Sequence, residues 1–171
     1  MAITATTLLE TEHGIFEVNY HRNDGSACLS LRMGDVSAAP PPLVRLHSAC
    51  LFGEAFGGID CDCRAQLQGA LNTIAQKGRG VLIYLFQEGR GIGLEAKIHA
   101  LELVRVEGVD TVESLQRMGY EPDLRQYDGA VQALKDLNTY TQIRLISNNP
   151  EKRGQLENGG FEVVEMVKLK Y

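Results

Sequence analysis

Three cysteines, Cys50, Cys61 and Cys63, lie within fourteen residues of one another, and this cluster constrains the chain more than any other feature. Thiolates favour zinc over magnesium or calcium. A structural zinc site normally has four protein ligands, whereas three leave a position for water, as in catalytic sites. The three glycines between Cys50 and Cys61 allow the loop to fold back. We therefore predict a catalytic zinc site, where zinc would lower the pKa of bound water to about 7.

Two other interpretations of the cysteines remain open. They could be small buried apolar side chains, although Cys61 and Cys63 flank the acidic Asp62 and share no apolar period. The site could also be a closed structural one, with Cys28 or His47 as the fourth ligand. No partner pattern surrounds the remaining histidines, which we expect at the surface: His13, His21 and His99.

Length and charge limit the classes of protein that this chain can belong to. The 171 residues, 44% of them hydrophobic, suffice for one domain with a real core. The net charge of −5 argues against non-specific nucleic-acid binding, so an anionic ligand must meet a local basic pocket. No apolar run reaches the length of a membrane span, and the N-terminus does not resemble a signal peptide. We expect one soluble, cytoplasmic domain over residues 1–171.

Strand and helix patterns alternate along the chain. Strands are expected at Gly14–Tyr20, Ala27–Met33, Leu43–His47, Val81–Phe86, Ile143–Ile146 and Phe161–Leu169, with a hairpin turn at Asn23–Ser26. Helices are expected at Arg64–Gln76, at Leu94–Val106, at Leu124–Leu137 and after Asn148-Asn149-Pro150. Because the two kinds of element interleave, the fold class is α/β or α+β, with a mixed sheet flanked by helices.

Several residue types suit a phosphorylated ligand. Guanidinium and ammonium groups bind phosphate oxygens, and the chain offers Arg45, Arg90, Arg125 and Lys152. The helix start at Asn148-Asn149-Pro150 would present free N–H groups to an anion. Each charged residue could instead be a solvated surface group. Their coincidence with the cysteine loop favours a functional site.

The motifs occur in one order along the chain. They are Arg45-Leu-His47-Ser48-x-Cys50, Cys61-Asp-Cys63-x-x-Gln66, Gln87-Glu88-Gly89-Arg90-Gly-Ile-Gly-Leu94, Asp110-Thr111-Val112-Glu113, Asp123-Leu-Arg125 and Ser147-Asn148-Asn149-Pro150-x-Lys152. In order and spacing they resemble the GTP cyclohydrolase II family, from about residue 14 to the C-terminus. Each motif alone is weak, and together they are highly specific.

The resemblance implies an activity and a role for each matching residue. The family opens the imidazole ring of GTP, releasing formate from C8 and pyrophosphate, as the first step towards riboflavin. Zinc held by the three cysteines would activate water for attack at C8. Arg125 would act at the α-phosphate in pyrophosphate loss, and Asp123 would accept a proton, although Asp123 also suits a helix cap. The nucleotide pocket would be formed by Arg45, His47, Ser48, Gln66, Glu88, Gly89, Arg90, Thr111, Ser147 and Lys152. The resemblance also implies a homodimer, and magnesium would accompany a triphosphate.

The chain departs from the family's pattern at several positions, always from polar to apolar. Leu101 stands where the family has tyrosine, Ala49 where it has glutamate, Leu115 where it has asparagine, and Leu85-Phe86 where it has a polar pair. Tyrosine can donate a proton or orient water and leucine cannot, so hydrolysis of the formamide would be slowed or lost. The alternatives are therefore a divergent secondary-metabolism paralogue, which retains the formyl group or acts on another purine nucleotide, an inactive nucleotide-binding zinc protein, and a structural zinc domain.

Overall fold

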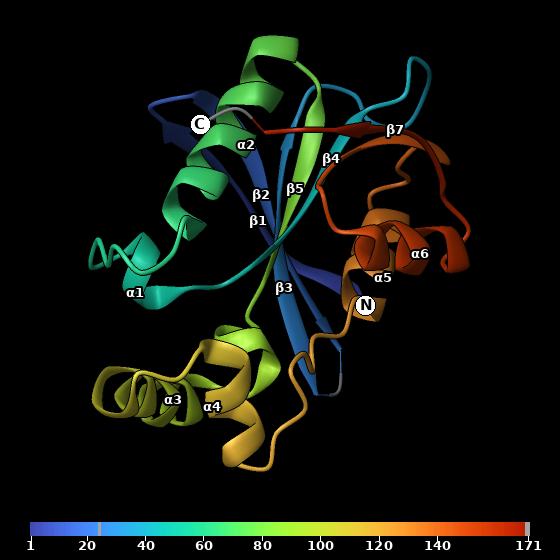
Figure 1. Ribbon diagram of the computed structural model, residues 1–171. Helices are drawn as coiled ribbons and strands as arrows, with labels where there is room; N and C mark the ends of the chain where they lie inside the picture. Colours follow the sequence, from blue (N-terminus) through green and yellow to red (C-terminus); the bar gives the residue numbers. More distant parts are fainter. Residues whose placement is uncertain (24, 170–171) are drawn as a thin grey trace.

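A mixed sheet of seven strands forms the centre of the computed structural model, which describes residues 1–23 and 25–169 (Figure 1). The strands are β1 (Ala2–Thr11), β2 (Gly14–Asn23), β3 (Ser26–Met33), β4 (Leu43–Ser48), β5 (Gly80–Leu85), β6 (Gln142–Ile146) and β7 (Glu162–Val167). Their order across the sheet is β1-β2-β3-β5-β4-β6-β7. Neighbours from β1 to β5 pair antiparallel, and those from β5 to β7 pair parallel. The predicted α/β class with a mixed sheet is confirmed.

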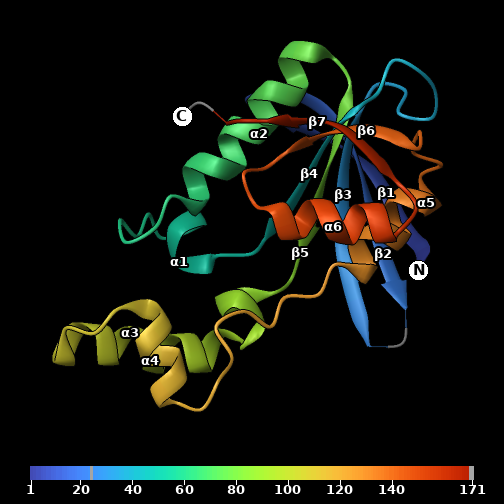
Figure 2. The same cartoon turned by 45° about the vertical axis from the view of Figure 1, so that its right-hand side comes forward.

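The helices lie in three groups. They are α1 (Leu51–Glu54), α2 (Cys63–Lys77), the 3-10 helix η1 (Glu88–Gly91), α3 (Leu94–Glu107), α4 (Thr111–Arg117), α5 (Asp128–Asp136) and α6 (Pro150–Asn158). Helix α2 covers one face of the sheet, and α5 and α6 cover the other, whereas α3 and α4 form a lobe beyond the end of β5 (Figures 1 and 2). None of the helices in the described part of the chain has the length and apolar character needed to cross a bilayer.

The hydrophobic core has two halves, one on each face of the sheet. On the α2 face, Leu71 and Ile74 pack with Phe16 and Leu82. On the opposite face, side chains of α5 and α6 pack against the alternate residues of β4 and β5. Every residue of β5 except Tyr84 is buried, which explains its continuous apolar run, since a parallel strand covered on both faces does not alternate.

The parallel strands determine where the functional motifs meet. Strand β4 leads into α1, β5 into η1, and β6 into α6, so the three connections begin at one edge of the sheet. Helix α2 covers one face of the sheet, and α5 and α6, on either side of β6 in the chain, cover the other. The crevice at such a change of face is the usual ligand site of an open α/β sheet.

The structure corrects four expectations. Strand β1 and helix α4 were not expected. The helix expected at Leu124–Leu137 begins only at Asp128, so the interpretation of Asp123 as a helix cap is wrong. The C-terminal strand ends at Val167 rather than Leu169. Asn23 pairs with Ser26 as the predicted hairpin requires, and Asp24 lies outside the described residues.

His21 is buried, although we expected it at the surface, because its ring forms hydrogen bonds with polar side chains of β3 and α5. Its Nε2 lies 2.8 Å from Ser30 Oγ, and its Nδ1 lies 3.4 Å from Asp136 Oδ2. Both ring nitrogens therefore have partners, as a buried polar side chain requires. Burial lowers the pKa of His21 and favours the neutral ring.

We expect replacement of Ile74 by alanine to lower the free energy of unfolding by about 2–5 kcal/mol, because the fully buried side chain would leave a cavity between α2 and the sheet. Urea denaturation would measure the change. Asn72→Ala, at an exposed position of the same helix, is the matched control and should stay within about 0.5 kcal/mol of the parent. A loss below that value for Ile74→Ala would contradict this account of the core.

Candidate metal centre and ligand pocket

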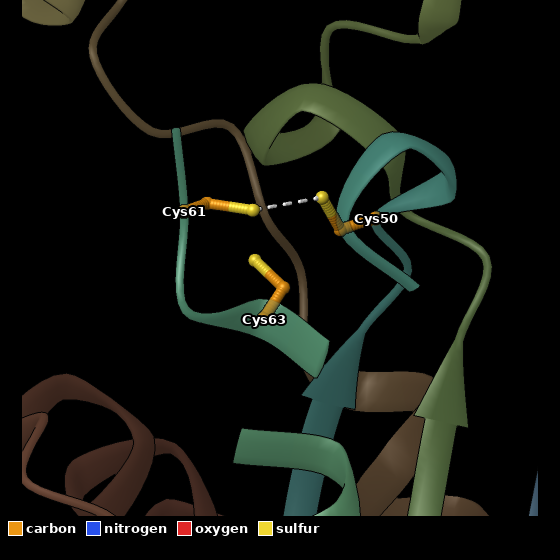
Figure 3. Close-up of side chains that lie close together, drawn as sticks. All are labelled: Cys50, Cys61 and Cys63. Atoms are coloured by element: carbon orange, nitrogen blue, oxygen red, sulfur yellow. Dashed lines mark hydrogen bonds between the residues drawn. The ribbon is translucent and has the colours of Figure 1, made fainter. Parts of the chain in front are cut away.

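Figure 3 shows the side chains of Cys50, Cys61 and Cys63 pointing towards one another. Cys50 precedes α1, Cys61 lies in the following loop, and Cys63 begins α2. The three Sγ atoms lie within 4.8 Å of one another, and those of Cys50 and Cys61 are 3.6 Å apart. No other Cys, His, Asp or Glu of the described residues joins this group. The donor set suits zinc with one coordination position left for water or substrate.

Neither of the two expected candidates for a fourth ligand, Cys28 and His47, joins the cysteine cluster. Cys28 is fully buried in the core, with Sγ 4.0 Å from Gly129 O, and burial raises its pKa to about 11. His47 Nε2 lies 2.9 Å from Glu54 Oε1, so its partner is a carboxylate. The structure therefore contradicts a closed site built with Cys28 or with this nitrogen of His47. The buried-apolar interpretation also fails, since Cys61 is exposed.

Gly53 makes room for the cluster. A Cβ at this position would lie 2.7 Å from Cys61 Sγ and 3.4 Å from Cys50 Sγ. The first distance is shorter than any van der Waals contact, so a side chain here would push the thiols apart. The residue is buried in α1, directly behind the sulfur atoms.

The thiols differ in how readily they ionise. Burial opposes ionisation of Cys50, but the N–H of Gly53 and the ammonium of Lys97, with Nζ 3.2 Å from Sγ, hold the pKa of this thiol below its usual value. Burial and the two neighbouring thiols raise the pKa of Cys63. The protein alone thus favours the thiolate of Cys50, and a divalent cation would supply the charge that ionises Cys63.

A cavity of about 550 Å³ opens beside the cysteines. Eleven residues predicted from the motifs line it together with the three cysteines: Arg45, His47, Ser48, Gln66, Glu88, Gly89, Arg90, Thr111, Asp123, Arg125 and Lys152. The twelfth, Ser147, lines a smaller cavity of about 220 Å³, which shares Arg45, Gln66, Arg125 and Lys152 with the first. The structure therefore brings all the predicted positions into one region.

The Gln87 side chain joins the turn after β5 to Gln126, the residue that follows Arg125. Gln87 Nε2 donates to Gln126 O at 2.5 Å, and Gln126 N–H donates to Gln87 Oε1 at 2.7 Å. Arg90 adopts a left-handed backbone conformation (φ 57°), and its carbonyl accepts a hydrogen bond from Leu124 N–H at 3.0 Å. These contacts hold an unfavourable backbone conformation beside the pocket.

Asp123 and Arg125 form an ion pair. Asp123 Oδ1 accepts from both the backbone N–H and the Nε of Arg125, at 3.0 and 2.8 Å, and Arg125 Nη2 contacts Oδ2. Although burial opposes ionisation, these hydrogen bonds hold the pKa of Asp123 below its usual range. Asp123 is therefore a carboxylate at neutral pH, aligned with the guanidinium.

Lys152 and Arg45 are two buried cations of the pocket. Lys152 Nζ donates to Leu46 O at 2.8 Å, and Arg45 donates to Ile146 O at 3.0 Å and to Gln66 Oε1 at 2.6 Å. Burial, with repulsion from Arg45 and Arg125, lowers the pKa of Lys152 to about 7. A phosphate group bound here would restore the charged form.

The start of α6 does not offer all the free N–H groups that the sequence suggested. Asn149 Oδ1 accepts from Glu151 N–H at 2.8 Å, and Ser147 Oγ accepts from Asn149 N–H at 3.0 Å. These two amides are satisfied within the segment, so the expectation is wrong for them. The hydroxyl hydrogen of Ser147 can still be donated to a ligand.

The apolar departures from the family's pattern divide into two groups. Leu101, Leu115 and Ala49 line the pocket, with the first two in the α3–α4 lobe. Leu85 is buried in the core and Phe86 is largely exposed, and neither is among the lining residues. The departures that affect the site are therefore the first three.

Two residues that contact the site, Lys97 and Glu54, were not identified from the sequence. Glu88 Oε1 accepts from Lys97 Nζ at 2.6 Å, and Glu88 Oε2 accepts from Leu51 N–H at 2.7 Å, so this pair links the Gly-rich turn to the cysteine loop. Glu54 lies one helical turn after Cys50 and accepts a hydrogen bond from its N–H at 3.0 Å. Four-residue spacing from Cys50 was the available signal for Glu54. No local pattern pairs Lys97 with Glu88.

The fold and the site together define an α/β protein in which a candidate three-cysteine metal centre opens onto a cationic pocket, as in a metal-dependent hydrolase. The chain belongs to the GTP cyclohydrolase II family, whose sequence profile matches residues 2–168. It is a family of hydrolases. The match begins earlier than the sequence motifs and includes β1.

Relatives with this domain are longer proteins. The riboflavin biosynthesis protein RibBA of Aquifex aeolicus is 45% identical over 169 residues, which cover 97% of this chain and 41% of that protein. RibBA of Bacillus subtilis is 47% identical over 164 residues, or 94% of this chain and 41% of the relative. The crystal structure of RibBX, a two-domain 3,4-dihydroxy-2-butanone 4-phosphate synthase from A. baumannii, matches with a TM-score of 0.53 at 15% identity, covering 99% of this chain and 40% of that one. This last likeness concerns the fold alone.

We expect Gly53→Ala to weaken zinc binding on the order of tenfold or more, because the new Cβ would displace Cys61 Sγ. Competition with a chromophoric chelator would measure the affinity. Gly154→Ala is the matched control, since a Cβ there has no atom within 4 Å, and it should bind zinc as the parent does. Equal affinity of the two variants would contradict the tight packing behind the cluster.

Proposed function

We propose that this chain is a GTP cyclohydrolase II-like domain that opens the imidazole ring of GTP by hydrolysis at C8 and releases pyrophosphate and formate. The observation that carries the proposal is the presence of three converging thiols and the cations Arg45, Arg125 and Lys152 on one pocket. The chain spans about two fifths of the length of the curated relatives it matches, so the activity is proposed for this part alone.

The proposed roles follow the chemistry of the side chains. Cys50, Cys61 and Cys63 would hold zinc, which when bound supplies a Lewis acid and water of lowered pKa. Arg45, Arg125 and Lys152 would bind phosphate oxygens. His47 Nδ1 and Ser48 Oγ are buried polar atoms without a hydrogen-bond partner among the described residues, and nucleotide groups would satisfy them. The other proposed contacts are Gln66, Glu88, Gly89, Arg90, Thr111 and Ser147.

Asp123 and Arg125 would act as a unit at the α-phosphate. Phosphate oxygens would compete with Asp123 for the Arg125 guanidinium, since both are anionic oxygen acceptors. A guanidinium shifted towards phosphate would stabilise the charge of the departing pyrophosphate. The Asp123 carboxylate, released from one strong donor, would then accept a proton more readily.

The apolar side chains that line the pocket suggest a second candidate product. Leu101 and Leu115 line the pocket and carry no group that could donate a proton or orient water. On this alternative the chain is a secondary-metabolism paralogue that leaves the formyl group on the ring-opened pyrimidine nucleotide, or that acts on another purine nucleotide. Pyrophosphate release would be unchanged.

Purified protein incubated with GTP, zinc and magnesium would separate the candidates through product mass and assays of formate and pyrophosphate. Stoichiometric formate contradicts the formyl-retaining alternative. No turnover of any of several purine nucleotides by zinc-loaded protein contradicts the proposed activity and favours an inactive nucleotide-binding zinc protein.

In the same assay Asp123→Asn should lower kcat by about 10²–10⁴-fold, because the amide cannot accept a proton. Asp128→Asn, an exposed position in the first turn of α5, is the matched control and should retain the parent rate. Equal rates for Asp123→Asn and the parent would remove Asp123 from the mechanism.

We also propose three further properties, of which only the homodimer rests on the family resemblance. Magnesium would accompany the triphosphate and neutralise part of its charge. The chain would work as a homodimer, and its location would be cytoplasmic.

Affinity for GTP should fall as pH rises through 7, because Lys152, with a pKa lowered to about 7 by burial and by its cationic neighbours, loses its charge in that range. Above this pKa each pH unit costs up to about tenfold in the Lys152 contribution. Calorimetric titration between pH 6 and 8 would measure this. Lys152→Arg should bind without the step, since arginine stays charged, and Lys152→Gln should bind weakly at every pH. A parent profile parallel to that of Lys152→Gln would contradict the assignment.

A further inference from the structure

Glu54 makes three hydrogen bonds from one carboxylate at the end of α1. Oε1 lies 3.0 Å from the backbone nitrogen of Cys50 and 2.9 Å from His47 Nε2, and Oε2 accepts from Tyr84 Oη at 2.7 Å. The side chain is 12% exposed. The three partners belong to the cysteine loop, to β4 and to β5, so Glu54 connects the first metal-binding position to two central strands.

This carboxylate touches neither the metal position nor the ligand directly. Glu54 is not a member of the cysteine cluster, and neither Glu54 nor Tyr84 is among the residues that line the pocket. Its effect on the site must therefore pass through Cys50 and His47. Both of these residues do line the pocket.

The position of His47 is fixed from two sides. His47 and Tyr84 are register partners on the parallel pair β4–β5, and their rings stack with centroids 5.7 Å apart. An ionised carboxylate only accepts hydrogen bonds, so the proton stays on His47 Nε2, which donates a hydrogen bond to Glu54. In the neutral ring Nδ1 is then the acceptor nitrogen, and it is buried without a partner among the described residues.

We propose that Glu54 is a positioning residue of the metal centre, which holds the Cys50 backbone against β4 and β5 and fixes the His47 tautomer so that Nδ1 can accept a hydrogen bond from the ligand. The inference rests on the proposed function and deepens it. Hydrogen-bonded groups behind metal ligands and ligand-binding histidines set their orientation, and their loss weakens metal binding.

Replacing Glu54 by glutamine or leucine separates hydrogen bonding from packing. The glutamine oxygen can still accept from Cys50 N–H and His47 Nε2–H, and its NH₂ can donate to Tyr84 Oη. Leucine has a similar volume and can make none of these bonds. Chelator competition at a temperature where the variants are folded should give zinc affinity within about threefold of the parent for Glu54→Gln, and 10–100-fold weaker for Glu54→Leu.

A merely structural role would give a different result. Glu54→Leu would then lower the Tm of the metal-free protein and leave zinc affinity within threefold of the parent, which overturns the proposal. If Glu54→Leu does not fold, Glu54→Asp serves instead, because it keeps the charge but withdraws the carboxylate by one methylene. Unchanged zinc affinity in Glu54→Asp is then the contradicting outcome.

The tautomer has a readout of its own. ¹⁵N NMR of histidine-labelled parent protein should show His47 protonated at Nε2 and bare at Nδ1, and a proton on Nδ1 instead would contradict the proposal. Neither measurement needs turnover. Zinc-loaded parent protein that fails to convert GTP would sink the proposed function, while the affinity and NMR results would still decide the role of Glu54.

Discussion

Strand β4 pairs in parallel with β5 on one side and with β6 on the other, and the rest of the site depends on this arrangement. Parallel strands end at the same edge of a sheet, so the segments after them are brought together although they lie far apart in the chain. The cysteine loop, the Gly-rich turn and the start of α6 are these segments. The pocket is therefore a consequence of topology, and its chemistry is supplied by the loops.

Electrostatics gives the pocket its preference for anions. Arg45 and Lys152 are both buried, and burial together with Arg45 and Arg125 lowers the pKa of Lys152 to about 7. Removing charge from water is costly unless a partner of opposite sign is present. The Asp123 carboxylate is committed to Arg125. A bound polyanion would offset the repulsion of Lys152 by Arg45 and Arg125, and it would restore the charged form of Lys152.

Sequence patterns predicted the elements whose signals are local and missed those that depend on distant partners. Helix α2 has an apolar stripe and a left-handed glycine at its end, and it was predicted within one residue at each end. Strand β1 is exposed along nearly its whole length and is defined by its pairing with β2, which no periodicity records. The segment before α5 has helical spacing of Leu124, Tyr127 and Val131, but hydrogen bonds to Gln87 and Arg90 hold its first residues in another conformation.

The same distinction applies to the site. Residues whose chemistry is specific to a site could be selected from the sequence, because function restricts the choice of side chain there. Clustered cysteines and a cation beside a glycine-rich turn are examples. Glu54 and Lys97 were not selected, because a glutamate or lysine on a helix is ordinarily a solvated group. Lys97 reaches Cys50 only where α3 meets the cysteine loop, and Glu54 reaches Tyr84 only where α1 meets β5. Sequence reasoning thus finds the groups that would touch the ligand. The groups that hold them in place become visible only through the tertiary contacts.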